Sequence, residues 1–220
     1  MRDMTRDPIY HNLVTALPRP GCAICRLARE KVHGYLDALL YENINDAGVR
    51  AQLRGAHGFC HRHAWEAAAL RDALGLAILY RDVVTAIGKE VKHARSGGRA
   101  PLRRLLRQDA PPPGQTALQR LTPARPCPAC TVETDVADTC LGMLAKHLGQ
   151  AEMAQAFSAS HGLCLPHLRR ALALTDDQDV IHTLLAKEGV VIDGLVGELS
   201  EFIRKHDYRF RHEGFGAERD

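Results

Sequence analysis

Aromatic residues are scarce in this chain, and long apolar runs are absent. Its 220 residues include one Trp, five Tyr and five Phe, so Leu, Ala, Val and Ile must build most of the core. That composition favours helices over sheet. No stretch approaches 18 uncharged apolar residues, and the charged start of the chain lacks the apolar segment of a signal peptide. We therefore expect an all-α cytoplasmic protein without a membrane segment.

The usual catalytic motifs are also missing. The chain contains no Gly-rich phosphate loop, no Ser-centred elbow and no paired-carboxylate motif. A nucleophilic thiol would need a Cys free to work with a base, but six of the seven cysteines belong to a repeated pattern. The seventh, Cys140, is predicted to be a small apolar residue on a buried helix face. We assign no catalytic residue, and the sequence leaves open whether the protein is an enzyme.

The repeated pattern is a Cys-x-x-Cys pair followed by a Cys-x-x-His pair. The gap between the two pairs is 34 residues in the first copy and 33 in the second. Each copy supplies three thiols and one imidazole, the closed set that tetrahedral zinc takes at structural sites. We predict one zinc per copy, or two per chain. The predicted ligands are Cys22, Cys25, Cys60 and His63 in the first copy, and Cys127, Cys130, Cys164 and His167 in the second.

A second pair of histidines repeats as faithfully as the predicted ligands. His57 and His161 each precede a Gly. They would cap the end of a short helix, or they would act as alternate ligands or as hydrogen-bond partners behind the ligands. His61 has no counterpart in the second copy, so we interpret it as a surface residue.

Three other interpretations of the cysteine pattern are an iron–sulfur cluster, a redox dithiol and covalently attached haem. The same residues could hold a [4Fe–4S] cluster, although four cysteines are its usual ligands. A thioredoxin-like dithiol would need a strand before the Cys pair, and no strand is predicted. Covalent haem would need His directly after each pair, where the chain has Arg26 and Thr131.

Helical periodicity organises the chain into two copies of one plan. In each copy a long helix starts at the Cys pair, a short helix follows, a third helix opens at the Cys of Cys-x-x-His, and a long apolar-striped helix ends the copy. The predicted segments are repeat 1 over residues 1–98, a linker over 99–125, repeat 2 over 126–206 and a frayed tail over 207–220.

Basic charge concentrates between the two copies. Residues 89–125 carry nine Lys or Arg against two acidic residues, a net charge of +7 in a chain whose total is +3. Ser96-Gly97-Gly98 and Pro111-Pro112-Pro113-Gly114 give this segment linker composition. Arg103, Arg104 and Arg107 could contact phosphates, so nucleic acid is a possible partner.

The motifs together resemble a family of uncharacterised bacterial proteins with a domain of unknown function. The resemblance rests on Cys22-Ala-Ile-Cys25, Asn45-Asp46-x-x-x-Arg50, Gly58-Phe59-Cys60-x-x-His63, Leu74-Gly75-Leu76-Ala77-Ile78-Leu79, and the downstream Cys127-Pro-Ala-Cys130 and Gly162-Leu163-Cys164-x-x-His167. Leu163 replaces the Phe usual in the family. The resemblance spans about residues 20 to 175 and implies a bacterial, cytoplasmic, repeat-built protein, but no activity.

The sequence thus predicts two pseudo-symmetric helical repeats, each closing around its own Cys₃His metal site. The preferred function is a zinc-stabilised scaffold or interaction module that binds a protein partner. One alternative is an iron–sulfur redox protein, sensor or cluster-dependent enzyme. Another is a nucleic-acid-binding regulator acting through the basic linker.

Overall fold

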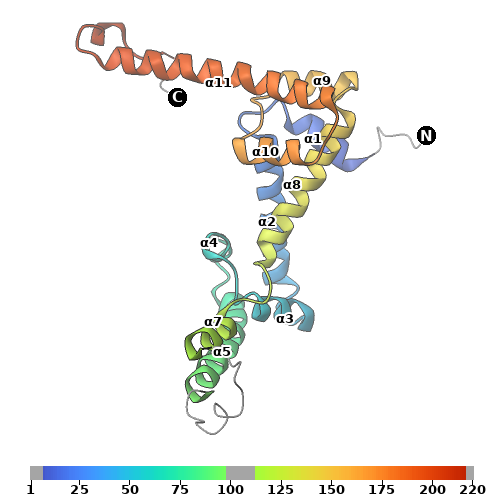
Figure 1. The fold of residues 1–220 in the computed structure, drawn as a ribbon, viewed down its shortest axis with the longest axis vertical. Coiled ribbons are helices and arrows are strands. Elements are labelled where there is room, and N and C mark those ends of the chain that lie inside the picture. The colour runs from blue at the N-terminus through green and yellow to red at the C-terminus, as the bar shows by residue number, and fades with distance from the viewer. Residues whose placement is uncertain (1–6, 98–111, 217–220) are drawn as a thin grey trace. The chain divides into compact units, whose positions relative to one another are not determined.

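Helices form every regular element of the protein that the structure describes. The computed structural model describes residues 7–97 and 112–216 (Figure 1). The all-α prediction is confirmed for these ranges, and none of their helices is long and apolar enough to cross a membrane. The elements are α1 (Pro8–Ala16), α2 (Ala23–Tyr41), α3 (Ala47–Gly55), α4 (His61–Ala69), α5 (Ala73–Gly97), α7 (Pro113–Leu121), α8 (Pro128–His147), α9 (Ala151–Ser158), α10 (Leu165–Ala173), α11 (Gln178–His206) and the 3₁₀ helix η2 (Arg211–Glu213).

Local capping explains where two of the helices begin. Asp46 caps α3 by accepting a hydrogen bond of 2.7 Å from the Val49 backbone N–H. Asp177 caps α11 in the same way through the N–H of Asp179 at 2.9 Å. Each of these two helices therefore begins at the residue after a capping Asp.

Two short helices were not predicted. Helix α1 begins at Pro8 after the capping residue Asp7, and α7 begins at Pro113 after Pro112. Proline suits the first turn of a helix because its missing N–H would have no partner there. Helix α7 lies within the segment predicted to be a linker. The central arginines of that segment, Arg103, Arg104 and Arg107, lie outside the described residues.

The described part of the C-terminal tail also differs from the prediction. Residues 207–216 were predicted to fray, but they fold back against the end of α11 and include η2. The Phe202 and Phe215 rings are 5.4 Å apart, and the Arg204 guanidinium forms an ion pair with Glu213. Aromatic contact and charge pairing thus order a segment without helical periodicity.

The chain divides into two compact units, and the predicted repeats do not coincide with them. Unit 1 comprises Met1–Leu27 and Val136–Asp220, and unit 2 comprises Ala28–Asp135. The division falls inside α2 and inside α8. Unit 1 therefore joins the start of repeat 1 to most of repeat 2, and unit 2 joins the rest of repeat 1 to the start of repeat 2.

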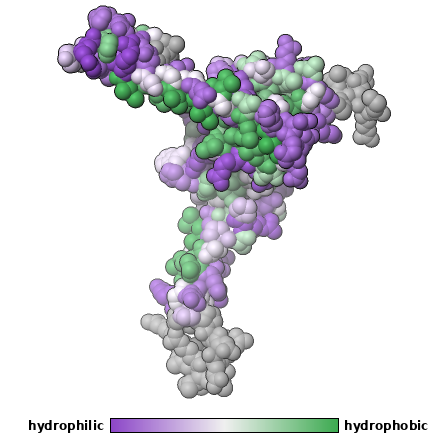
Figure 2. Space-filling view, turned by 45° about the horizontal axis from the view of Figure 1, so that its top comes forward, coloured by the Kyte–Doolittle hydropathy of each residue, from purple (hydrophilic) through white to green (hydrophobic). Residues whose placement is uncertain are grey.

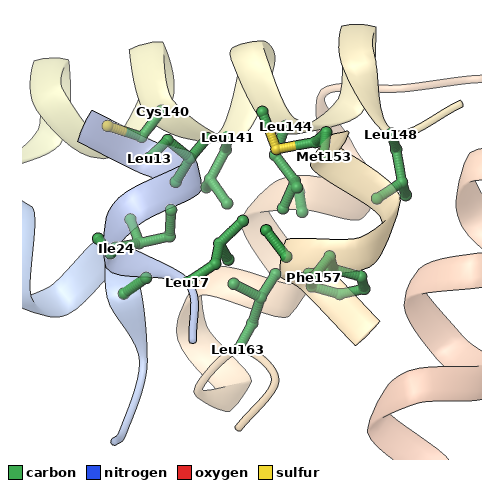
Figure 3. Close-up of a cluster of buried hydrophobic side chains, with 14 of the residues drawn as sticks. Leu13, Leu17, Ile24, Cys140, Leu141, Leu144, Leu148, Met153, Phe157 and Leu163 are labelled. Atoms are coloured by element: carbon green, nitrogen blue, oxygen red, sulfur yellow. The ribbon is translucent and has the colours of Figure 1, made fainter. Parts of the chain in front are cut away.

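Unit 1 has its own apolar core (Figure 3). Helix α1 and the start of α2 pack there against the last turns of α8 and against α9. Truncating a buried leucine of this core to Ala would lower the free energy of unfolding by about 2–5 kcal/mol, because apolar burial is lost and a cavity is left behind. The largest fully buried side chains of this core are Leu13, Leu17, Ile24, Leu141, Leu144, Met153, Phe157 and Leu184.

Unit 2 has a separate core. There the later turns of α2 pack against the first turns of α8 and against α3, α4 and α5. Helix α7 packs along α5, and Arg120 pairs with Glu90 across the two helices at 3.3 Å. The core residues are Val32, Leu36, Leu39, Leu40, Leu53, Phe59, Ala67, Leu79, Val83 and Ala129.

Candidate metal centres

Helix N-termini position all the predicted ligands of the first copy. Cys22 precedes α2 and Cys25 lies in its first turn. Cys60 is the N-cap residue of α4 and His63 lies on the first turn of that helix. Unpaired N–H groups and the helix dipole stabilise negative charge at such positions, which favours the thiolate form that binds metals.

The second copy repeats this placement. Cys127 precedes α8, with Cys130 in its first turn. Cys164 is the N-cap residue of α10, and His167 lies on the first turn. Every predicted ligand therefore lies directly before a helix or within its first turn.

Four ligand atoms converge in unit 1 to form a group that we call site 1. It contains Cys22, Cys25, Cys164 and His167, whose ligand atoms all lie within 4.8 Å of one another. The His167 Nδ1 atom is 3.5 Å from the Cys22 Sγ, 3.4 Å from the Cys25 Sγ and 3.1 Å from the Cys164 Sγ. The Cys25 and Cys164 sulfurs are 3.5 Å apart.

Four further ligand atoms converge in unit 2 to form a second group, which we call site 2. It contains Cys60, His63, Cys127 and Cys130, again within 4.8 Å. The His63 Nδ1 atom is 3.3 Å from the Cys60 Sγ, 3.6 Å from the Cys127 Sγ and 3.4 Å from the Cys130 Sγ. The Cys60 and Cys130 sulfurs are 3.6 Å apart.

The prediction that each repeat closes around its own site is wrong. Site 1 takes its Cys pair from repeat 1 and its Cys-x-x-His from repeat 2, and site 2 does the reverse. The reason is the length of α2, whose 19 residues carry the chain roughly 28 Å along the helix axis. The nine residues of α3 span only about half of that, so the chain does not return to its own Cys pair.

Close packing of the thiols perturbs their acidity. Burial, a hydrogen bond with Cys164 and the neighbouring thiolates raise the pKa of Cys25 to about 12. Burial and contacts with Cys60 and Cys127 raise the pKa of Cys130 to about 12 in the same way. Three thiolates so close together repel one another, and a bound cation would offset this repulsion. The two sites have the electrostatics of cation sites.

The histidine of site 2 is completely buried and lies beside charged neighbours. Burial, together with the adjacent Arg62 guanidinium, lowers the pKa of His63 and keeps the ring neutral, the form that binds metals. Its Nε2 atom lies 3.7 Å from a Glu133 carboxylate oxygen and 3.8 Å from a Glu66 oxygen. Arg62 pairs with Glu133. A ligating histidine usually directs its second nitrogen at a carboxylate. Here the Arg62 Nη2 atom lies closest to the His63 Nε2, at 2.7 Å, and the two carboxylates lie just beyond hydrogen-bond distance.

A glycine with positive φ precedes each Cys-x-x-His. Gly58 has a φ of +94° and Gly162 a φ of +72°, so both adopt the conformation that glycine tolerates best. A Cβ atom on Gly162 would lie 2.7 Å from a Glu188 carboxylate oxygen, and one on Gly58 would lie 3.3 Å from the Tyr80 ring. These turns place Cys60 and Cys164 at the starts of their helices.

Glu188 is a buried residue that the sequence analysis missed. Its carboxylate accepts a hydrogen bond of 2.5 Å from the Leu163 backbone N–H, directly before Cys164. Burial raises the pKa of Glu188 despite that hydrogen bond. The sequence did contain a signal for Glu188, because this residue is an acid within an apolar stripe of α11. A carboxylate buried at such a position needs a hydrogen-bond donor beside it.

The other candidate residues stand apart from the two sites. Neither His57 nor His161 belongs to either group of ligand atoms. His57 lies two residues after the end of α3 and has a φ of +55°. The Gly58 N–H donates to the Leu53 carbonyl at 2.8 Å, as in a helix C-cap. Cys140 is buried in the core of unit 1, as predicted.

The fold and the two sites define an all-helical protein with two Cys₃His groups able to bind metal. A family model described as a family of unknown function (DUF6062) matches residues 13–220, and the chain belongs to this family. It is 24% identical over 198 residues to an "Uncharacterized 23.9 kDa protein in xynA 3'region" from Caldicellulosiruptor sp. (strain Rt8B.4), covering 90% of this chain and 88% of that protein. No solved structure matches the chain.

Proposed function

We propose that the protein is a zinc-stabilised helical scaffold that binds one Zn²⁺ in each unit. The supporting observation is the spacing of the ligand atoms. Four tetrahedral ligands at zinc–sulfur and zinc–nitrogen bond lengths place sulfurs about 3.8 Å apart and sulfur about 3.6 Å from nitrogen. The sulfur–sulfur contacts of 3.5 and 3.6 Å and the sulfur–nitrogen contacts of 3.1–3.6 Å come close to these values.

The same spacing supports a single ion over a [4Fe–4S] cluster. In a cluster each ligand binds a different iron at a different corner, so the ligand atoms lie farther apart than they do around one ion. All four ligand atoms of each site lie within 4.8 Å of one another. Zinc also suits a closed set of three thiolates and one imidazole.

The structural role follows from the length of chain that each site closes. Site 1 joins residues up to 145 positions apart, and site 2 joins residues up to 70 positions apart. Metal binding that closes such long loops offsets a large loss of chain entropy. Zinc would therefore supply folding free energy to two small cores that contain few aromatic residues.

The test is elemental analysis with a visible absorption spectrum on protein purified without oxygen. We expect two zinc per chain and no colour. Cys60→Ser and Cys164→Ser should each lose one zinc and lower the melting temperature, whereas Cys140→Ala, which removes a thiol outside both sites, should keep both ions. Iron with sulfide and a brown chromophore would refute the proposal and favour the redox alternative. Full zinc content in both Ser variants would also contradict it.

A further inference from the structure

Unit 2 contains a cavity that lies outside both groups of ligand atoms. Its volume is about 450 Å³, within the range of small-molecule sites. Figure 2 shows hydrophobic side chains along α11, but the exposed face of a single helix is convex and cannot enclose a small molecule. The cavity lies among α2, α3 and the start of α8, and its lining includes Tyr35, Gln52, Arg125, Pro126, Pro128 and Val132.

Helix α7 is the counterpart of α1 in the repeated plan, but it packs against a different neighbour. Both of its bounds lie 105 residues after those of α1, and the same offset separates Cys22 from Cys127. Helix α1 packs against α9 in unit 1. The counterpart of α9 is α3, yet α7 packs along α5 rather than along α3. The place beside α3 is therefore left open, and the cavity includes Gln52 of α3.

The lining of the cavity corresponds to residues that belong to a closed core in unit 1. Tyr35 corresponds to Cys140 at an offset of 105, and Gln52 corresponds to Ala156 at an offset of 104. Both counterparts are buried in the core that α1 completes (Figure 3). The cavity of unit 2 thus lies where unit 1 is filled by a helix of the chain itself.

The differences between the two copies replace core contacts with hydrogen-bonding groups. A thiol and a methyl group are buried in unit 1 where the cavity carries a phenol and an amide. Arg26 holds the end of α1 through hydrogen bonds to the Ala16 carbonyl at 2.6 Å and to the Pro20 carbonyl at 2.5 Å. Its counterpart is Thr131, whose short side chain bonds the Cys127 carbonyl of its own helix at 3.4 Å. Unit 2 therefore lacks the clamp that fixes a helix in this place and offers polar groups instead.

Arg125 gives the cavity a positive charge. The backbone N–H groups of Ala124 and Arg125 donate to the Gly55 carbonyl at 2.9 and 3.2 Å, and the Arg125 side chain lies against Gly55. No acidic residue lines the cavity, and none of the described carboxylates pairs with this guanidinium. The Tyr35 hydroxyl and the Gln52 amide also have no hydrogen-bond partner within the described ranges. The cavity thus combines a fixed cation with two polar groups that are available to a ligand.

We propose that this cavity binds a small molecule with an apolar body and an anionic end, either a carboxylate or a phosphate. The Arg125 guanidinium pairs with the anionic end, since its parallel N–H groups match the oxygens of either group. Tyr35 and Gln52 donate hydrogen bonds to the polar part of the molecule. Val132 and Pro128 pack against its apolar body, as apolar side chains do in most small-molecule sites.

The test titrates the zinc-loaded, ¹⁵N-labelled full chain with benzoate and with phenyl phosphate, and follows the backbone amides by NMR. Benzyl alcohol is the control, because it has the same ring without the charge. We expect one of the two anions, or both, to shift the amides around Gln52 and Val132, and the alcohol to bind about tenfold more weakly or worse. Benzoate alone would assign the cavity to carboxylates, and phenyl phosphate alone would assign it to phosphates.

Three variants test the roles of the residues. Arg125→Met removes the charge and keeps the length of the side chain, so it should weaken binding of the anions about tenfold or more. Gln52→Trp fills part of the cavity from α3 and should abolish binding. Arg29→Met changes an exposed arginine of α2 outside the cavity lining and should bind as wild type does. Zinc content, measured in parallel, should be the same in all three variants and in wild type.

Three results would overturn the proposal. The first is a wild-type chain that binds neither anion, and the second is binding of benzyl alcohol that equals binding of the anions. The third is a set of shifted amides that lie away from the cavity and persist in Gln52→Trp, because the anions would then bind elsewhere. Anion binding that Arg125→Met leaves unchanged would overturn the role of the guanidinium.

Discussion

Site 1 and site 2 share the same four ligand types, but they differ in what surrounds the histidine. His63 of site 2 is completely buried, and Arg62, Glu66 and Glu133 gather around its Nε2 atom. His167 of site 1 is only half-buried. Duplicated ligands therefore do not imply equal burial, and we expect site 2, with its completely buried histidine, to hold its ion more firmly.

The residues that correspond to the site 2 neighbours explain the difference. Pro166 takes the position of Arg62, and Arg170 takes the position of Glu66. Arg170 pairs with Asp138 at 2.6 Å in a largely exposed ion pair, which contributes little to stability. Helix α10 thus carries no carboxylate at the position where α4 carries Glu66.

The largest effect is expected from removing two ligands at once. These double variants test which Cys pair shares a site with which Cys-x-x-His. Cys25→Ser with Cys164→Ser removes two ligands of site 1 and should lose one zinc per chain. Cys25→Ser with Cys60→Ser removes one ligand from each site and should lose two. Elemental analysis distinguishes the two results. The opposite result would mean that each repeat closes around its own ion after all.

An intermediate effect is expected from the carboxylate behind His63. Glu133→Gln keeps the size of the side chain but removes its charge. Arg62, whose Nη2 atom lies 2.7 Å from the His63 Nε2, then loses its ion-pair partner, and the ring loses a nearby negative charge. The zinc affinity of site 2 should fall about 10-fold to 100-fold. Competition with a chromogenic chelator measures this, and Asp138→Asn in unit 1 is the matched control that should leave site 2 unchanged. Equal affinities in wild type and Glu133→Gln would remove the distinction between the sites.

The smallest effect is expected from Glu188. Its carboxylate holds the turn before the Cys-x-x-His of unit 1, whereas the Tyr80 ring lies against the corresponding turn of unit 2. Burial raises the pKa of Glu188 above its usual 4.5, so the folded protein binds this proton more tightly than the unfolded chain does. The stability that depends on this proton is complete below pH 4.5 and is lost as pH rises through the folded pKa.

Glu188→Gln should abolish that loss, because the amide oxygen still accepts from the Leu163 N–H without a charge to bury. Chemical denaturation at several pH values measures the difference from wild type. Glu30→Gln changes an exposed acid and should follow the wild-type curve. Parallel curves for wild type and Glu188→Gln would show that the Glu188 carboxyl does not titrate in the folded state.

Local features of the sequence predict most of the helices and all the members of the two sites. Asp46 and Asp177 cap helices, and Gly58 and Gly162 end the turns before the ligands, because these effects depend on neighbouring residues. The sequence could not show that each Cys pair joins the Cys-x-x-His of the other repeat. The motif spacing fits this pairing and the pairing within one repeat equally, and only the direction in which α2 carries the chain decides between them. Glu133 was also missed, because 70 residues separate it from His63 in the chain.

The order in which the ligands emerge during synthesis adds a consequence of the exchanged pairing. Cys22 and Cys25 leave the ribosome before every ligand of site 2, yet site 1 is complete only when His167 has followed. Site 2, whose ligands span 60 to 130, is complete before any Cys-x-x-His for the first pair exists. The Cys pair of site 1 is thus made before site 2 but completed after it, and a nascent chain stopped between the two halves displays an open Cys pair to any competing metal or oxidant.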